Sequence, residues 1–199
     1  MSDHYFSAQP KAESAPRHVR LALRDVQVGL TTDTGVFSPT AVDAGTLVLL
    51  ESVPAPPPTG DLLDLGCGYG PITVTLARRA PDARVWGVDV NERARELARL
   101  NTASSPNVRI EGPDGIPDDV RFATIWSNPP IKVGKPVLHG MLRRWLPRLT
   151  ADGVAYLVVQ RHLGADSLHK WLEGEGFPTD RLASRKGYRI LAVRTREQA

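Results

Sequence analysis

The chain has 199 residues, of which 41% are hydrophobic and 24% charged, with one cysteine and a formal net charge of +3. This composition is typical of a single globular domain, with room for a small appendage, and the mild positive charge is compatible with a nucleic-acid partner without requiring one. No run approaches the roughly 18 apolar residues of a membrane span, the polar N-terminal segment lacks a secretory core, and one cysteine cannot form an internal disulfide, so we expect a cytoplasmic protein without a membrane partner.

Apolar and polar residues alternate from Val19 to Leu30, on both sides of Arg24-Asp25. Alternation with period two around a short polar turn predicts a β-hairpin within residues 17–32.

A loop and a helix are expected after the hairpin. Residues 35–39 contain Gly and Pro and predict the loop, and the leucines of residues 40–53 indicate the helix. The proline-rich run at 54–58 ends that helix and forms a short, stiff connector. We expect residues 1–58 to form an extension that packs on a main domain of residues 59–199.

From residue 61 onward, apolar strands alternate with helical segments. The strands are predicted at 61–65, 84–89, 107–111, 122–127, 154–160 and 188–194, and the helices at 71–79, 92–103, 137–149 and 165–174. This alternation predicts an α/β fold of the Rossmann-like type, a doubly wound and mostly parallel seven-stranded sheet with an N-terminal β-hairpin extension. The segment Val154–Gln160 is apolar on both faces, which is typical of a central strand.

Three glycines follow the first of these strands and open the next helix. They are Gly66, Gly68 and Gly70, preceded by Asp64. Glycine allows a tight turn and the close approach of a ligand to the backbone. The spacing differs from the G-x-G-x-x-G of dinucleotide sites, and the preceding acid favours a ligand that carries a cation and a carboxylate. S-adenosylmethionine fits, with its ammonium donating to Asp64 directly or through water; the alternative is a purely structural glycine turn.

Carboxylates also follow the next two strands. Asp89 ends the second strand, where it is placed to accept from both hydroxyls of a ribose, although Asp89 or Asn91 could instead cap the following helix. Asp114 follows the third strand and could accept from an adenine amine, or it could belong to an ordinary Pro-Asp-Gly turn. Cys67 lies inside the glycine loop without an evident neighbouring base, so we expect it to fill space rather than act as a nucleophile. The five histidines lack metal-ligand spacing, and we predict no metal.

The segment Ser127-Asn128-Pro129-Pro130-Ile131 follows the fourth strand, at the edge of the sheet where open parallel sheets bind ligands. The lone pair of an aromatic or amide NH₂ is delocalised, so such an amine reacts only when it is well positioned. An Asn side-chain oxygen and a backbone carbonyl can each accept one N–H, and two prolines stiffen the loop. We therefore predict Asn128, Pro129 and Pro130 as catalytic residues; the alternative is a strand cap followed by a Pro-Pro turn.

Taken together, DLGCGYG, VDVN and SNPPI resemble class I S-adenosylmethionine-dependent methyltransferases, and more narrowly the small-domain MTS group that contains RsmC-type ribosomal RNA guanine methyltransferases. The resemblance runs from Asp3–Ser7 through Asp33–Ser38 to Lys186–Leu191, and the short single-domain members look most similar. It implies that residues 59–199 are the methyltransferase domain and that S-adenosylmethionine is the cofactor. It also implies roles for Asp64, Gly66, Gly68 and Gly70 at the methionine part, Asp89 at the ribose, Asp114 at the adenine, Asn128 and Pro129 at the target amine, and Phe37 beside the site.

Ile131 departs from the pattern of many amino-methylating enzymes, which have an aromatic residue at this position to stack on the target base. An aliphatic side chain can pack on a base but lacks the π-face that makes stacking strong. Phe37, Tyr5 or Trp126 could take this role, although Trp126 is expected in the core.

Basic residues follow the proline motif. We expect Lys132 and Lys135 to contact the substrate, and the next helix carries Arg143, Arg144 and Arg148. These arginines could form a phosphate-facing patch or a solvated helix face.

The expected function is methylation of the exocyclic 2-amino group of a guanine in small-subunit (16S) ribosomal RNA, with ribosomal RNA or the small ribosomal subunit as partner. Three alternatives stay open: a protein glutamine amide N-methyltransferase, an RNA assembly factor that binds the cofactor without turnover, and a small-molecule N-methyltransferase. A related Asn-Pro-Pro motif serves the glutamine chemistry, but that family usually has Tyr at the position of Ile131.

Overall fold

A seven-stranded sheet forms the centre of the computed structural model, which describes residues 12–195. Its strand order is β5-β4-β3-β6-β7-β9-β8. Neighbouring strands are parallel from β5 to β7, and β9 runs antiparallel to both β7 and β8. This confirms the predicted Rossmann-like, doubly wound sheet. The strands are β3 (Asp61–Leu65), β4 (Arg84–Val88), β5 (Val108–Glu111), β6 (Phe122–Ser127), β7 (Leu149–Gln160), β8 (Thr179–Arg185) and β9 (Tyr188–Arg194).

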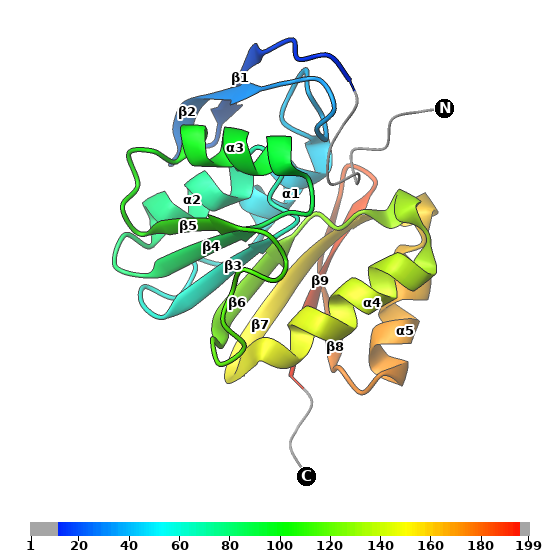
Figure 1. Cartoon of the computed structure of the whole chain (residues 1–199). Coiled ribbons are helices and arrows are strands. Elements are labelled where there is room, and N and C mark those ends of the chain that lie inside the picture. The colour runs from blue at the N-terminus through cyan, green and yellow to red at the C-terminus, as the bar shows by residue number, and fades with distance from the viewer. Residues whose placement is uncertain (1–11, 196–199) are drawn as a thin grey trace.

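Helices cover both faces of this sheet (Figure 1). One layer contains α1 (Ala44–Ser52), α2 (Pro71–Arg79) and α3 (Glu92–Asn101), and the other contains α4 (Lys135–Trp145) and α5 (Ala165–Gly174). Within residues 12–195 there are also three short 3₁₀ turns: η1 (Ile131–Val133), η2 (Leu146–Arg148) and η3 (Arg161–Leu163). The apolar side chains of β7 enter both layers, with Val158 on the α1 side and Leu157 and Val159 on the α4 side. This explains why that segment is apolar on both faces.

The N-terminal hairpin forms a separate two-stranded sheet of β1 (Arg17–Ala22) and β2 (Gln27–Thr32), and it lies against α3 (Figure 1). Its inward-facing Val19, Leu21 and Leu30 are buried in the same apolar layer as α1 and α2. The predicted hairpin is therefore confirmed, and its apolar residues extend the core of the main sheet.

Several elements differ from the sequence-based expectation: the strand predicted at 154–160 begins earlier, at Leu149, and two further differences have a clear physical reason. The helix predicted at 137–149 ends at Trp145 and continues as η2, because Pro147 has no N–H for a helical hydrogen bond. Strand β8 was not predicted. Most of its side chains are polar and at least partly exposed, because it is an edge strand that pairs only with β9, so it lacks the apolar alternation of the other strands.

Candidate functional site

A cleft of about 230 Å³ lies where β3, β4 and β6 end at the carboxyl edge of the sheet. Open parallel sheets bind ligands at this edge. The cleft brings together most of the site residues predicted from the sequence, along with apolar residues from α4. It is lined by Phe37, Leu65, Gly66, Gly68, Val88, Asp89, Val90, Asn91, Ala94, Pro113, Asn128, Pro129, Pro130, Val137, Met141 and Trp145.

The glycine loop forms one wall of the cleft. Gly66 and Gly68 have φ angles of +78° and +54°, and a Cβ at either position would meet no atom within 4 Å. Both glycines thus expose backbone to open space, which a ligand can approach closely. Gly70 is different, because its Cβ would touch Ala98 at 3.5 Å and it is outside the lining. Gly70 therefore has a structural role: it caps the start of α2 and lets this turn pack closely against α3.

Asp89 lies in the cleft, with both carboxylate oxygens held by backbone amides. Its Oδ2 accepts from the Gly68 N–H at 2.9 Å and its Oδ1 accepts from the Asn91 N–H at 2.8 Å. Burial raises the pKa of Asp89, and these hydrogen bonds oppose that shift. A carboxylate oxygen has more than one acceptor site, so each can also accept from a ribose hydroxyl. The helix cap is Asn91, whose Oδ1 accepts from Ala94 N at 3.2 Å, which leaves Asp89 for a ligand.

Asp64 lies beneath the glycine loop rather than in the cleft. Its side chain is fully buried, Oδ2 accepts from Thr73 Oγ1 at 2.6 Å, and Oδ1 has no hydrogen-bond partner in the described residues. A buried acceptor without a donor is costly, so a cationic group or a water that reached it would be favoured. Burial raises the pKa of Asp64 to about 7, and the hydrogen bonds from Thr73 oppose the shift.

This pKa predicts a stability effect of Asp64→Asn. Between pH 4 and pH 7 the folded protein keeps the Asp64 proton while the unfolded chain has lost it, so stability falls as pH rises through this window. The wild-type free energy of unfolding should fall relative to that of Asp64→Asn with a slope of up to about 1.4 kcal/mol per pH unit. Urea unfolding from pH 4 to pH 8 without added cofactor measures it, and a constant difference between the two proteins would contradict it.

Asp114 is not brought into the cleft. Its side chain is 92% exposed and forms an ion pair with Arg144 at 2.8 Å, while the preceding Pro113 lines the cleft instead. The role expected for Asp114 therefore requires a movement of this turn, whereas Pro113 already faces the ligand space.

Asn128 is fixed in one orientation. Its Nδ2 donates to Asp43 Oδ2 at 2.8 Å and to Thr46 Oγ1 at 3.0 Å. A carboxylate can only accept, so the amide nitrogen must face α1 and the amide oxygen is directed away from it. The motif is tied to the sheet by Ser127 Oγ, which donates to the Leu65 carbonyl at 2.6 Å. The Pro129 carbonyl accepts from Ile131 N at 2.9 Å and retains a second lone pair.

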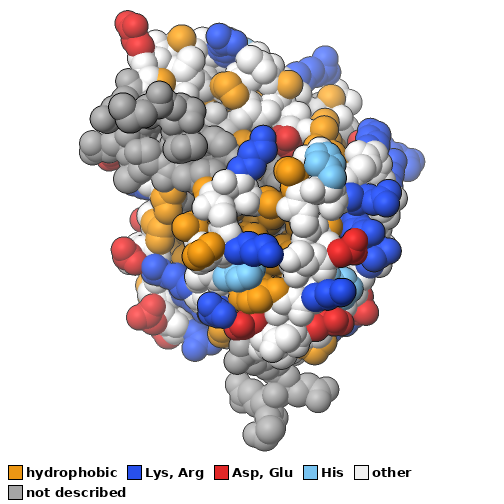
Figure 2. All heavy atoms as spheres, turned by 90° about the vertical axis from the view of Figure 1, so that its right-hand side faces the viewer, with side chains coloured by type: hydrophobic (Ala, Val, Ile, Leu, Met, Phe, Trp, Pro, Cys, Tyr) orange, Lys and Arg blue, Asp and Glu red, His pale blue; other side chains and the backbone are white. Residues whose placement is uncertain are grey.

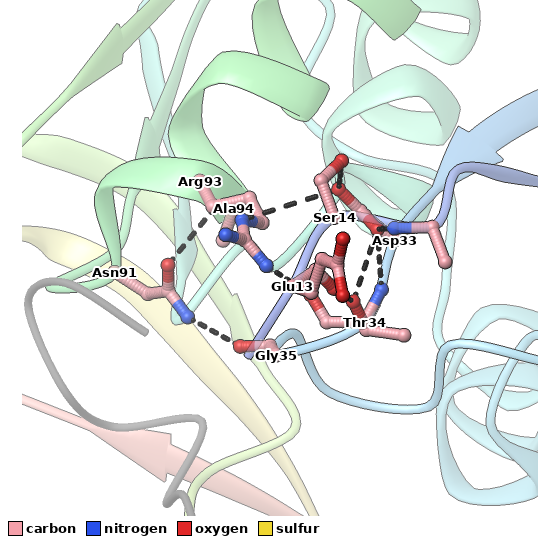
Figure 3. A network of polar contacts seen from close by, with 9 residues as sticks. Glu13, Ser14, Asp33, Thr34, Gly35, Asn91, Arg93 and Ala94 are labelled. Carbon is pink, nitrogen blue, oxygen red and sulfur yellow. Dashed lines mark hydrogen bonds and ion pairs between the residues drawn. The ribbon is translucent and has the colours of Figure 1, made fainter. Parts of the chain in front are cut away.

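Phe37 reaches the cleft because a polar network holds its loop against α3 (Figure 3). Asn91 Nδ2 donates to the Gly35 carbonyl at 2.8 Å, and Arg93 Nη1 donates to the Thr34 carbonyl at 2.9 Å. Asn91 therefore has two functions, as it caps α3 and anchors the loop that carries Phe37.

Ile131, Lys132 and Lys135 lie beside the cleft rather than in its lining. Ile131 packs partly on the α4-side core and, with Lys135, lines a second groove between α4 and α5, while Lys132 is exposed on η1. Trp126 is fully buried, as expected. Tyr5, with the whole segment 3–7, lies outside the described residues.

The three arginines after the motif have structural partners. Arg143 pairs with Glu175 at 2.8 Å, Arg144 pairs with Asp114, and Arg148 is buried over Trp145. The phosphate-patch interpretation is therefore wrong for Arg148, whose guanidinium donates to backbone carbonyls.

Cys67 is buried, and burial raises the pKa of its thiol, which is typical of an unreactive, space-filling cysteine. Within residues 12–195 no group of three or more His, Cys, Asp or Glu side chains is arranged to hold a metal. In the same residues no helix has the length and apolar character needed to span a membrane.

Sequence reasoning missed two sets of site residues. Asp43 and Thr46 hold the Asn128 side chain, and both lie within residues 40–53, where the sequence predicted only a helix. Val137, Met141 and Trp145 of α4 form the apolar side of the cleft, and their helical spacing gave no means of separating ligand contacts from core contacts.

The chain is similar to several known proteins. The family model described as "Methyltransferase small domain" matches residues 27–192. "Uncharacterized protein YbxB" of Bacillus subtilis is 36% identical over 98% of this chain and 99% of its own length, and "Ribosomal RNA small subunit methyltransferase C" of Pseudomonas aeruginosa is 32% identical over 94% of this chain. A solved T. thermophilus 16S rRNA N2 methyltransferase (RsmC), in complex with AdoMet and guanosine, is 26% identical with a TM-score of 0.76 over 94% of this chain. This chain spans 57% of the Pseudomonas protein and 52% of the T. thermophilus chain.

Proposed function

The chain belongs to the methyltransferase small domain family, and from this premise we propose that it methylates the exocyclic 2-amino group of a guanine in small-subunit ribosomal RNA. The protein is an S-adenosylmethionine-dependent methyltransferase of the RsmC type. The proposed ribosomal RNA substrate is supported by the names of the Pseudomonas and T. thermophilus relatives, which describe ribosomal RNA methyltransferases. We infer that residues 1–58 act as an extension of the methyltransferase domain of residues 59–199, since they contribute Phe37 to the cleft.

One observation supports the amino-group chemistry best: the Asn128 amide oxygen is directed away from α1 in a cleft that also contains Gly66, Gly68 and Asp89. The exposed glycine backbone and the buried Asp89 carboxylate fit the methionine and ribose parts of S-adenosylmethionine, which supplies an electrophilic methyl group on a sulfonium when bound.

Asn128 Oδ1 and the Pro129 carbonyl would each accept one N–H of the target amine. Two acceptors fix the plane of the NH₂ group and increase the electron density on its nitrogen, so that its lone pair is directed towards the methyl donor. Since Pro129 and Pro130 restrict the backbone, the acceptors would be positioned before the substrate binds. Phe37, which lines the same cleft, would supply the aromatic surface for the base that Ile131 does not provide.

The exposed lysines beside the cleft are proposed to contact RNA phosphates. Figure 2 shows the face that carries α4 and α5, where Lys and Arg side chains, with some Asp and Glu side chains among them, surround exposed hydrophobic ones. Lys132 and Lys135 lie on this side next to the proline motif, and neither has a carboxylate partner among the described residues.

Replacing both lysines by alanine should weaken RNA binding and reduce the slope of log K against log salt by about 2, one for each lost phosphate contact. Filter binding of ribosomal RNA fragments between about 50 and about 300 mM salt measures this slope. Arg109→Ala, which removes an exposed cation from β5 at the far edge of the sheet, is the matched control and should leave the slope unchanged. Equal slopes for the lysine variant and the wild type would contradict the proposed contact.

Incubation with tritiated S-adenosylmethionine and small ribosomal subunits from cells that lack the protein tests the function. Label in RNA supports the proposal. Label in a protein band would support the glutamine alternative, and cofactor binding without incorporation would support an assembly factor.

A further inference from the structure

Asp43 is a partly buried carboxylate at the N-terminus of α1 that the amine-binding motif does not include. Its Oδ2 accepts from the Thr46 N–H at 3.0 Å, as an N-cap does, and also from Asn128 Nδ2 at 2.8 Å. In the described residues no Lys or Arg forms an ion pair with Asp43. A negative charge without a cationic partner therefore lies directly behind the proposed amine acceptor.

We propose that Asp43 is the positioning residue for Asn128: its carboxylate fixes the orientation of the Asn128 amide and polarises it towards the target amine. Thr46 assists through its hydroxyl oxygen. This inference rests on the proposed amino-methyl transfer for its catalytic consequence, while its structural part concerns the Asn128 side chain alone.

The orientation follows from the chemistry of the partners. An Asn side chain has a donor end and an acceptor end that can exchange places by a rotation of 180°. With Asp43 behind it, the rotated form would bring the amide oxygen against a carboxylate, two acceptors without a proton between them. Without the Asp43 carboxylate, this repulsion would be absent, and the Asn128 amide could rotate and present its NH₂ group to the incoming amine.

The second consequence is electrostatic. As the amine nitrogen attacks a sulfonium methyl, positive charge develops on that nitrogen. A hydrogen bond from Nδ2 to a carboxylate makes the amide oxygen a stronger acceptor, and charge-assisted hydrogen bonds are stronger than neutral ones. The negative charge of Asp43 therefore stabilises the positive charge that develops on the amine nitrogen in the transition state. The carboxylate is already in position before the reaction starts.

The surroundings of Asp43 are apolar or neutral rather than cationic. The Tyr69 and Tyr188 rings lie near it, and burial followed by the Asp43 charge raises the pKa of both phenols. A Cβ at Gly45 would come within 2.9 Å of Asp43 Oδ2 and 2.8 Å of Tyr188 Cε1, so glycine at this position leaves room for the carboxylate beneath the tyrosine.

Asp43→Ser separates the capping role from the positioning role. Serine is a good N-cap, so it can still accept from Thr46 N, but its hydroxyl is too short to reach Asn128. We expect a change in Tm of less than about 3 °C and a loss of about 10- to 100-fold in kcat on small ribosomal subunits. The KM for RNA should change less than about twofold, because the interaction acts in the transition state.

Two further variants refine this expectation. Asp43→Asn keeps the size and an acceptor oxygen but removes the charge, so it should restore part of the lost kcat. In an Asn128→Ala background, Asp43→Ser should cost nothing further, since a residue that acts through Asn128 has no role without it. Additive losses in the double variant would overturn the proposal.

An NMR measurement tests the structural part without any substrate. The side-chain NH₂ signals of Asn128, identified by their disappearance in Asn128→Ala, should exchange slowly with water in the wild type and faster in Asp43→Ser. Unchanged exchange in Asp43→Ser would overturn the proposed contact even if the enzyme proved to act on another substrate. If the wild type transfers no methyl group to RNA while the NMR result is as expected, the proposed function fails and the contact stands.

Cofactor binding by calorimetry completes the test. Asp43→Ser should bind S-adenosylmethionine with unchanged affinity. A loss of affinity with unchanged kcat would mean that Asp43 contacts the cofactor instead, which would contradict its role behind Asn128.

Discussion

Asn128→Ala is expected to lower kcat for methyl transfer by about 10²- to 10³-fold, the effect of removing one preorganised polar group from an electrostatic site. The amide oxygen is the proposed acceptor for one N–H of the target amine, and Asp43 and Thr46 hold it in place. Because this interaction concerns the amine, the affinity for S-adenosylmethionine should change less than about threefold. Single-turnover kinetics and calorimetry on the same protein measure the two quantities.

Asn107→Ala provides the matched control for Asn128→Ala. The Asn107 side chain also donates two hydrogen bonds, to the Ala80 and Ala83 carbonyls, but it lies before β5 at the opposite end of the sheet. The Asn107→Ala variant should be less stable than the wild type but should retain its kcat. Full activity of Asn128→Ala would exclude the amine-acceptor mechanism.

Asp89→Ala is expected to weaken S-adenosylmethionine binding about 100-fold, since it removes the two charge-assisted hydrogen bonds that we propose Asp89 accepts from the ribose, of about 1.5 kcal/mol each. It also frees the Gly68 and Asn91 N–H groups that Asp89 holds, so the glycine loop loses part of its fixed shape. Isothermal calorimetry at neutral pH measures the affinity.

Asp114→Ala serves as the comparison for Asp89→Ala. Its carboxylate is exposed and paired with Arg144, so its removal should weaken cofactor binding less than about threefold unless the turn closes on the ligand. A larger loss in Asp114→Ala than in Asp89→Ala would reverse the assignment of the two carboxylates.

The sequence predicted the sheet because each buried strand had a local signal. Segments such as Phe122–Ser127 combine an apolar run with polar turn residues, and the positions of Gly66, Gly68 and Asp89 at strand ends follow from the parallel arrangement alone. Strand β8 could not be predicted, because an edge strand with exposed polar side chains is defined by its partner β9 and not by its own pattern.

The contacts around Asn128 could not be predicted from the sequence for a similar reason. Asp43 lies 85 residues before Asn128, and the two come together because α1 packs against the sheet, mainly on β7. The sequence predicted only a helix over residues 40–53, and the hydrogen bond between Asp43 and Asn128 depends on tertiary structure. Asp114 shows the opposite case, since its position after a strand suggested a ligand contact but the turn directs its side chain to Arg144 and solvent.

The most direct test of the central claim is the identity of the methylated nucleoside. Small ribosomal subunits from cells that lack the protein are incubated with tritiated S-adenosylmethionine and either the wild type or Asn128→Ala, and the RNA is digested to nucleosides for chromatography. We predict that the wild type places the label in N2-methylguanosine and that Asn128→Ala places almost none. Label in another nucleoside, in protein alone, or equally with both enzymes would contradict a guanine amino-methyltransferase that works through Asn128.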